Sequence, residues 1–136
     1  MTQTYRDGKL LKTALFVVLG AVFWLEGFLA IRFEGSLLLV KSNFRLLFLF
    51  TSALPISWIF VKIGAVVSNT KGQDLLGGVV LMSITALLLD GIGLTWFQSW
   101  YGLELTQLIL AAAWLLWGVG VGLAIGYWQS YLNVEN

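Results

Sequence analysis

The chain has 136 residues, of which 59% are hydrophobic and only 11% are charged, and its mean hydropathy is +0.88. Soluble domains carry about one quarter charged residues, so this composition excludes an ordinary soluble domain and indicates an integral membrane protein. The chain has no cysteine and no histidine, which excludes disulfides, thiolate chemistry and imidazole-based metal sites. We therefore expect no metal or other cofactor. The net charge of +1 includes no basic tract, so no nucleic acid partner is expected.

The first apolar stretch covers residues 13–33. About 20 apolar residues are enough for a helix to cross the hydrocarbon core of a bilayer, so this stretch predicts a first transmembrane helix. Basic residues precede it, as in a signal peptide, but no small-residue cleavage site follows, and we expect the helix to be retained. The polar residues 1–12 predict a poorly ordered or interfacial tail, and Glu34, Gly35 and Ser36 predict a break or a bend at the end of the helix.

Three further spans follow, at residues 44–63, 75–97 and 105–128. The second contains Pro55, which predicts a kink near Thr51 and Ser52, whose hydroxyls can bond the freed carbonyls. Breaker and polar residues at 68–73 predict a turn before the third span. The chain therefore predicts a single all-α domain, an integral membrane bundle of four transmembrane helices.

Lysine and arginine residues in the short connections favour both termini on the cytoplasmic side. With this orientation the aromatic residues after the third span, Trp96, Trp100 and Tyr101, are expected at the outer interface. The basic residues divide between the cytoplasmic side (Arg6, Lys9, Lys12, Lys62 and Lys71) and the outer side (Lys41 and Arg45).

Three ionisable residues lie inside the predicted spans: Glu26, Arg32 and Asp90. Both acids lie near the outer ends of helices that run in the same direction, so we expect them at one depth, about 10 Å below the interface at 1.5 Å per residue. Arg32 leans toward the amino terminus of its helix and is expected to reach Asp90. Because such groups are costly in a membrane, the cluster is interpreted either as a structural Arg32–Asp90 pair or as the site of a proton-linked transporter using Glu26 or Asp90.

Trp24 and Trp114 are expected at a similar depth. A carboxylate combined with indole faces is suited to binding organic cations, so these two residues are candidates for an aromatic lining. Since the chain has seven tryptophans, packing against other helices or lipid is the simpler interpretation.

Gly118, Gly122 and Gly126 repeat at every fourth residue of the fourth span. Small residues at this spacing let membrane helices approach closely. The pattern favours packing within the bundle, and it also fits packing against a second copy or another membrane protein. The lipid bilayer is the one partner that the composition requires.

Parts of three predicted helices resemble a family of uncharacterised bacterial membrane proteins with four spans, a domain of unknown function. The resemblance lies in Phe-Trp-Leu at 23–25, Ile-Arg-Phe at 31–33 with Gly35, Leu-Asp at 89–90, Trp-Phe at 96–97 and Ala-Trp-Leu-Leu-Trp at 113–117. It implies a four-span fold in the bacterial inner membrane, and no known reaction. Arg32 and Asp90 match polar positions of that family, whereas Glu26 stands where the family has a small or apolar residue.

Glu26 and the Trp-Gly-Val-Gly segment at 117–120 also resemble the small multidrug resistance transporters, which exchange protons for cationic drugs through a first-helix glutamate. In that family the similar segment lies in the third helix, whereas here it lies in the fourth. No nucleophile, metal-ligand set or phosphate loop accompanies the acids, so we do not expect an enzyme. The sequence favours a structural or accessory membrane protein, with a small proton-linked transporter as the alternative; it does not define a substrate, partner or oligomeric state.

Overall fold

The computed structural model describes residues 2–132, apart from the side chain of Asn43. All regular elements in this part of the chain are helices: α1 (Thr2–Leu38), α2 (Asn43–Ser68), α3 (Gly72–Trp96), α4 (Gln98–Tyr101) and α5 (Leu105–Leu132). Within the described residues four of them, α1, α2, α3 and α5, are long and apolar enough to cross a membrane. The predicted all-α bundle of four long helices is confirmed.

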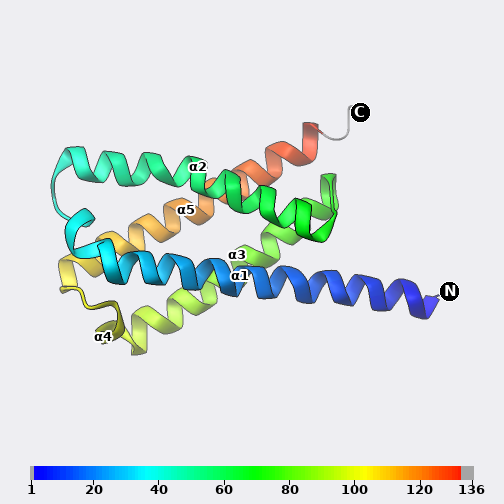
Figure 1. Ribbon diagram of the computed structural model, residues 1–136, viewed down its shortest axis with the longest axis horizontal. Helices are drawn as coiled ribbons and strands as arrows, with labels where there is room; N and C mark the ends of the chain where they lie inside the picture. The colour runs from blue at the N-terminus through cyan, green and yellow to red at the C-terminus, as the bar shows by residue number, and fades with distance from the viewer. Residues whose placement is uncertain (1, 133–136) are drawn as a thin grey trace.

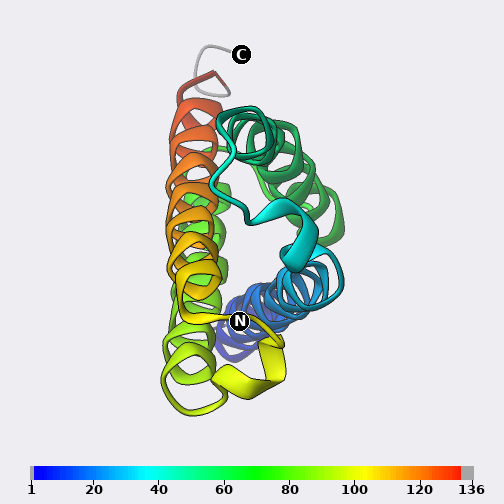
Figure 2. The same cartoon turned by 90° about the vertical axis from the view of Figure 1, so that its left-hand side faces the viewer.

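The long helices form a ring in the order α1, α3, α5, α2 (Figure 1, Figure 2). α1 packs chiefly against α3, α3 against α5, and α5 against α2, whereas the contact between α2 and α1 that closes the ring is less extensive. The short helix α4 follows α3 and lies close to α1. The chain order therefore differs from the spatial order, and α1 and α3, which are not consecutive in the sequence, pack side by side.

Helix α1 is longer than its predicted span, with 37 residues beginning at Thr2. The prediction of a poorly ordered tail is wrong for the described residues 2–12, which continue the helix beyond the other three long helices (Figure 1). An interfacial position of this segment stays a prediction. Once a helix exists, each added residue gains a backbone hydrogen bond, and only Gly8 in this segment strongly disfavours helix. A polar sequence is therefore no obstacle to extending the helix.

The predicted helix break at Glu34, Gly35 and Ser36 is also wrong, because α1 continues to Leu38. Gly35 is buried, and a Cβ atom at this position would lie 3.2 Å from the side chain of Leu103. The glycine here allows the segment before α5 to pack closely on α1. Its role is a tertiary contact that the local sequence does not reveal.

Pro55 lies inside α2, and three hydrogen bonds support the helical turn before it. The Ser52 hydroxyl donates to the Leu49 carbonyl at 2.6 Å, while Thr51 is exposed. Two donors come from α5, where the indole of Trp114 donates to the Leu49 carbonyl at 3.1 Å and that of Trp117 to the Phe50 carbonyl at 3.0 Å. The two indole bonds join α2 to α5 near the turn that the proline weakens.

Two apolar clusters fill the interior of the ring. One lies toward the end that holds α4 and includes Ile31, Leu49, Tyr101 and Ala111. The other lies toward the connection between α2 and α3 and includes Phe16, Val61, Leu75, Val79 and Met82. The middle of the bundle, between these clusters, contains the candidate site.

Candidate functional site

A cavity of about 140 Å³ lies in the middle of the bundle, with wall residues from all four long helices. An engineered apolar cavity of about 150 Å³ is known to bind benzene, so this space can hold a small organic group. Asp90 is the only ionisable residue among the described residues of the wall. The hydroxyl groups of the wall belong to Ser57 and Ser83. The aromatic residues of the wall are Phe23, Trp24, Phe60 and Trp114.

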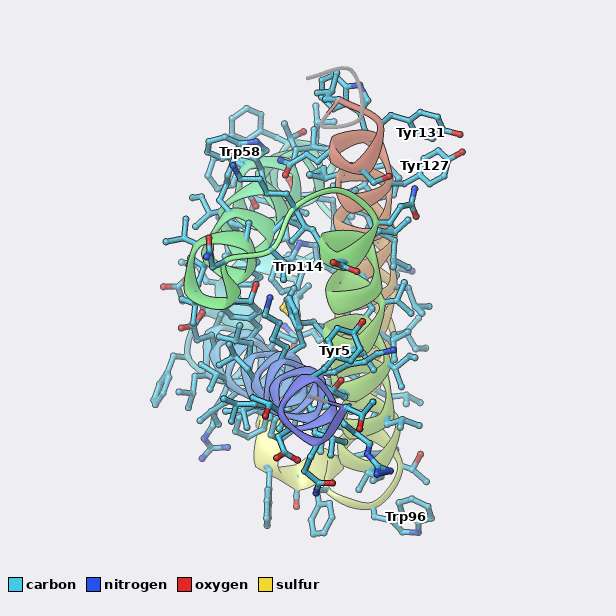
Figure 3. All side chains as sticks on the ribbon, turned by 90° about the vertical axis from the view of Figure 1, so that its right-hand side faces the viewer. Tyr5, Trp58, Trp96, Trp114, Tyr127 and Tyr131 are labelled. Atoms are coloured by element: carbon cyan, nitrogen blue, oxygen red, sulfur yellow. The ribbon has the colours of Figure 1, made fainter. Side chains whose placement is uncertain are left out.

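The aromatic wall is built from three helices. Phe23 of α1 stacks on Phe60 of α2 with ring centroids 4.2 Å apart and an interplanar angle of 1°. Trp114 comes from α5 on the opposite side, and Figure 3 shows it near the middle of the bundle, whereas Trp96 and Tyr131 project from its periphery. Both tryptophans proposed from the sequence, Trp24 and Trp114, therefore line one cavity.

The glycines of α5 have two different surroundings. Gly126 is buried, and a Cβ atom there would lie 3.1 Å from Val79 of α3. Gly118 has no neighbour within 4 Å of such an atom, and Gly122 has only Ser57 at 4.0 Å. Gly126 thus allows α5 to pack closely on α3. Gly118 and Gly122 line the cavity, and their missing side chains leave it open.

Asp90 is buried, with 8% of its surface exposed. Two aromatic side chains that carry an N–H or O–H group lie beside it. Trp24 of α1 is one of them. The other is Tyr101 of α4, which lies across Gly93, one helical turn after Asp90, where a Cβ atom would come within 2.6 Å of the Tyr101 hydroxyl. Phe28 holds the tyrosine ring from α1, edge to face at 4.9 Å between centroids.

The indole nitrogen of Trp24 and the hydroxyl of Tyr101 are both buried, and neither forms a hydrogen bond of normal geometry with another described residue. Burial and the neighbouring Asp90 carboxylate raise the pKa of Tyr101 to about 12, so its hydroxyl stays protonated at physiological pH. Two buried donors thus lie close to one buried carboxyl group. Buried donors of this kind call for an acceptor, and the carboxyl group of Asp90 lies beside both of them.

Arg32 does not pair with Asp90, so the predicted ion pair is wrong. Its guanidinium group is exposed and donates a hydrogen bond to the backbone carbonyl of Trp100 in α4. Depth along the helix placed the two residues at compatible levels, but the side chains leave their helices in different directions. Arg32 instead attaches α4 to α1, and α4 carries Tyr101 onto Asp90.

Glu26 is also separate from this site. It lies on the exposed face of α1 and does not line the cavity, whereas Trp24, two residues earlier, does. The predicted cluster of Glu26, Arg32 and Asp90 therefore reduces to Asp90 with its aromatic neighbours. The described residues contain no group of three or more acidic residues able to hold a metal ion.

A double-mutant cycle tests whether Arg32 and Asp90 interact. Because Arg32 bonds to a backbone carbonyl, Arg32→Leu is expected to lower the free energy of unfolding by about 1.5 kcal/mol, the order for a hydrogen bond from a charged donor. The loss should be the same within about 0.5 kcal/mol in an Asp90→Asn background, which preserves side-chain volume. Thermal and denaturant unfolding in detergent measures both values. If the double variant instead recovered most of the lost unfolding free energy, Arg32 and Asp90 would form an ion pair after all.

Sequence reasoning did not identify Tyr101, Phe23 or Phe60 as site residues. Tyr101 was assigned to the interfacial aromatic residues, yet it is 1% exposed. The one local signal for its position is Gly93, three residues after Asp90, which leaves the surface of α3 open next to the acid. Comparison with known proteins adds no assignment: no family model, curated protein or solved structure matches the chain.

Proposed function

We propose that this is a small membrane carrier that binds an organic cation in the central cavity and exchanges it for a proton at Asp90. One observation carries the proposal: Asp90 is buried on the wall of an aromatic cavity and has no cationic partner among the described residues. An ionisable residue at this depth is expensive and is usually retained for a function. A bound cation would supply the missing partner.

The chemistry of the wall favours a cation that is partly apolar. Indole and phenyl faces attract positive charge, with about 2 kcal/mol or more for a desolvated pair. Trp24 and Trp114 offer indole faces, and Phe23 and Phe60 offer phenyl faces. Apart from Asp90 and two serines, the rest of the wall is apolar. A strongly hydrated metal ion would find one carboxylate and too few oxygen ligands, whereas a quaternary or protonated amine needs only the charge and the rings.

The same carboxylate can hold a proton or a cation, but not both. Cation binding and protonation of Asp90 therefore exclude each other, and this competition is the elementary step of an exchanger. Glu26 has no part in it, because it faces away from the cavity. Of the two acids considered from the sequence, the geometry supports Asp90.

Binding of benzyltrimethylammonium to the purified protein tests the proposal. Isothermal titration calorimetry in detergent at pH 8 should detect saturable binding, while neopentylbenzene, the neutral molecule of the same shape, should bind far more weakly. Asp90→Asn is expected to lower the affinity about 10- to 100-fold, the value of a charge-assisted contact of about 1.5 to 3 kcal/mol. Glu26→Gln is the matched control and should leave the affinity unchanged.

A structural or accessory role is the second candidate, and the position of Asp90 between Trp24 and Tyr101 favours it. In that case the acid would fix the packing of α1, α3 and α4. The two functions differ in what Asp90→Asn does. Lost stability with no cation binding in the parent protein would support the structural role, and lost binding with preserved stability would support the carrier.

We also propose that the bundle lies in a bacterial inner membrane with both termini in the cytoplasm. The beginning of α1, with Arg6, Lys9 and Lys12, lies at the same end of the bundle as Lys71 in the connection between α2 and α3 (Figure 1). Reporter fusions at Lys71 and after Asn136, which lies outside the described residues, should both be cytoplasmic, and one at Ser42 should be external. An external carboxyl terminus would contradict this orientation.

A further inference from the structure

A second cavity lies between α1 and α2, beside the central one. Its volume is about 250 Å³, and its wall includes Glu34 of α1 and Ser52 of α2. Two residues, Ile56 and Trp114, line both cavities. These two side chains therefore form the partition between the second cavity, here called the outer cavity, and the space beside Asp90.

The outer cavity exists because α1 and α2 diverge along their length. At one end they are in close contact, through the stacked rings of Phe23 and Phe60 and through Phe16, which would lie 3.6 Å from a Cβ atom at Gly64. Toward the connection at residues 39–42 the two helices separate (Figure 1). The open part of this interface holds the outer cavity, with the exposed Glu34 on its wall.

We propose that the outer cavity is the entrance by which the cation reaches Asp90, and that Trp114 is the gate between the two spaces. This inference rests on the proposed function and adds its route. Glu34 supplies a carboxylate at the entrance, where it attracts cations. The ligand passes from Glu34 through the outer cavity and past Trp114 to Asp90.

The contacts of Trp114 suit a gate. The indole is held by one hydrogen bond, from its nitrogen to the Leu49 carbonyl, and that carbonyl keeps a second donor, the Ser52 hydroxyl, when the indole leaves. Next to it on the partition, Ile56 follows Pro55, where α2 lacks a backbone donor. Rotation of the indole therefore breaks one bond and leaves no carbonyl without a donor.

The absence of cysteine from the sequence allows a direct test by thiol labelling. Single cysteines replace Ser52 in the outer cavity, Ser83 in the central cavity, or the neighbouring Ile84, which is exposed on the outside of α3. The probe is trimethylammonioethyl methanethiosulfonate, a membrane-impermeant cation, added to right-side-out or inverted vesicles. Ser52→Cys should react rapidly from the side of residues 39–42, Ser83→Cys slowly from that side only, and Ile84→Cys from neither side.

Substitutions at Ile56 or Trp114 should change the labelling rate of Ser83→Cys and leave that of Ser52→Cys unchanged. Trp114→Phe removes the donor to Leu49 and should raise this rate about fivefold, the effect of one lost hydrogen bond. Ile56→Trp fills the passage and should lower it, while Ser52→Cys reacts as before. Labelling of Ser83→Cys from the opposite side, no labelling at all, or a rate indifferent to both changes would each overturn the route.

The route and the carrier function can fail separately. The gate is measured with a neutral reagent, methyl methanethiosulfonate, as well as with the cation, and its dependence on Trp114 does not require Asp90. If the partition controls both reagents but benzyltrimethylammonium does not bind, the passage stands and the proposed function fails. If the cation binds at Asp90 while the partition has no effect, the function stands and this route fails.

Discussion

Replacing Gly78 with alanine is expected to destabilise the bundle by about 1 to 3 kcal/mol, the usual effect of overpacking a closely packed interior. Gly78 of α3 faces α1, and a Cβ atom there would overlap the ring of Phe16. That ring is 3% exposed and belongs to the apolar cluster of Val61, Leu75, Val79 and Met82, so it has little room to move. The substitution therefore strains the packing between α1 and α3.

The neighbouring glycine provides a matched control. Gly77 is exposed on the same helix, and a Cβ atom there meets nothing within 4 Å. Gly77→Ala is expected to increase stability by up to about 1 kcal/mol through helix propensity alone. The measurement is the midpoint of thermal unfolding in detergent for both variants. Equal effects of the two substitutions would mean that α1 and α3 do not pack as described.

The affinity for benzyltrimethylammonium is expected to fall about tenfold for each pH unit below the value at which Asp90 becomes protonated, because one proton replaces one cation. The sign follows from the competition: lowering the pH adds the proton that excludes the cation. Over two units the predicted loss approaches about 100-fold, or about 2.7 kcal/mol. This is the largest effect on binding that we expect.

The surroundings of Asp90 make this titration simple to assign. The one other titratable side chain found beside it, Tyr101, has its pKa raised to about 12 by burial and by Asp90, so it stays neutral through the range of the experiment. Calorimetry from pH 5 to pH 9 gives the affinities, and proton release into a weakly buffered solution gives the stoichiometry. A pH-independent affinity in the parent protein, or the same pH dependence in Asp90→Asn, would contradict exchange at Asp90.

The residues of the central cavity have distinct parts in the proposed site. Asp90 supplies the charge, Trp24 and Trp114 the aromatic faces, and Gly118 and Gly122 the space. Arg32 stays outside the cavity and holds α4, so that Tyr101 closes the end of the site near Asp90. A Cβ atom at Gly118 would meet no other atom within 4 Å, so a methyl group there would take up cavity space without a clash.

The fold class and the number of long helices could be predicted from the sequence. Length and hydropathy are local properties, and the thickness of a bilayer sets how many apolar residues a span needs. The same properties pointed to three site residues, Asp90, Trp24 and Trp114. An acid or an indole within a predicted span can be recognised from the sequence, and its position in the span gives its depth. The helix ends were harder to predict from the sequence. The extension of α1 to Thr2 depends on helix propagation, and its continuation through Gly35 depends on a contact with Leu103.

Which of these residues lie in contact depends on how the helices are arranged around the ring. Position along a helix gives depth, but the direction in which a side chain points relative to other helices depends on the order of helices in the ring, α1, α3, α5, α2, which local patterns do not encode. For this reason Arg32 bonds to Trp100 and not to Asp90, and Glu26 lies on the exposed face. For the same reason Tyr101, 11 positions after Asp90 in the printed sequence, returns to it through α4 and Gly93.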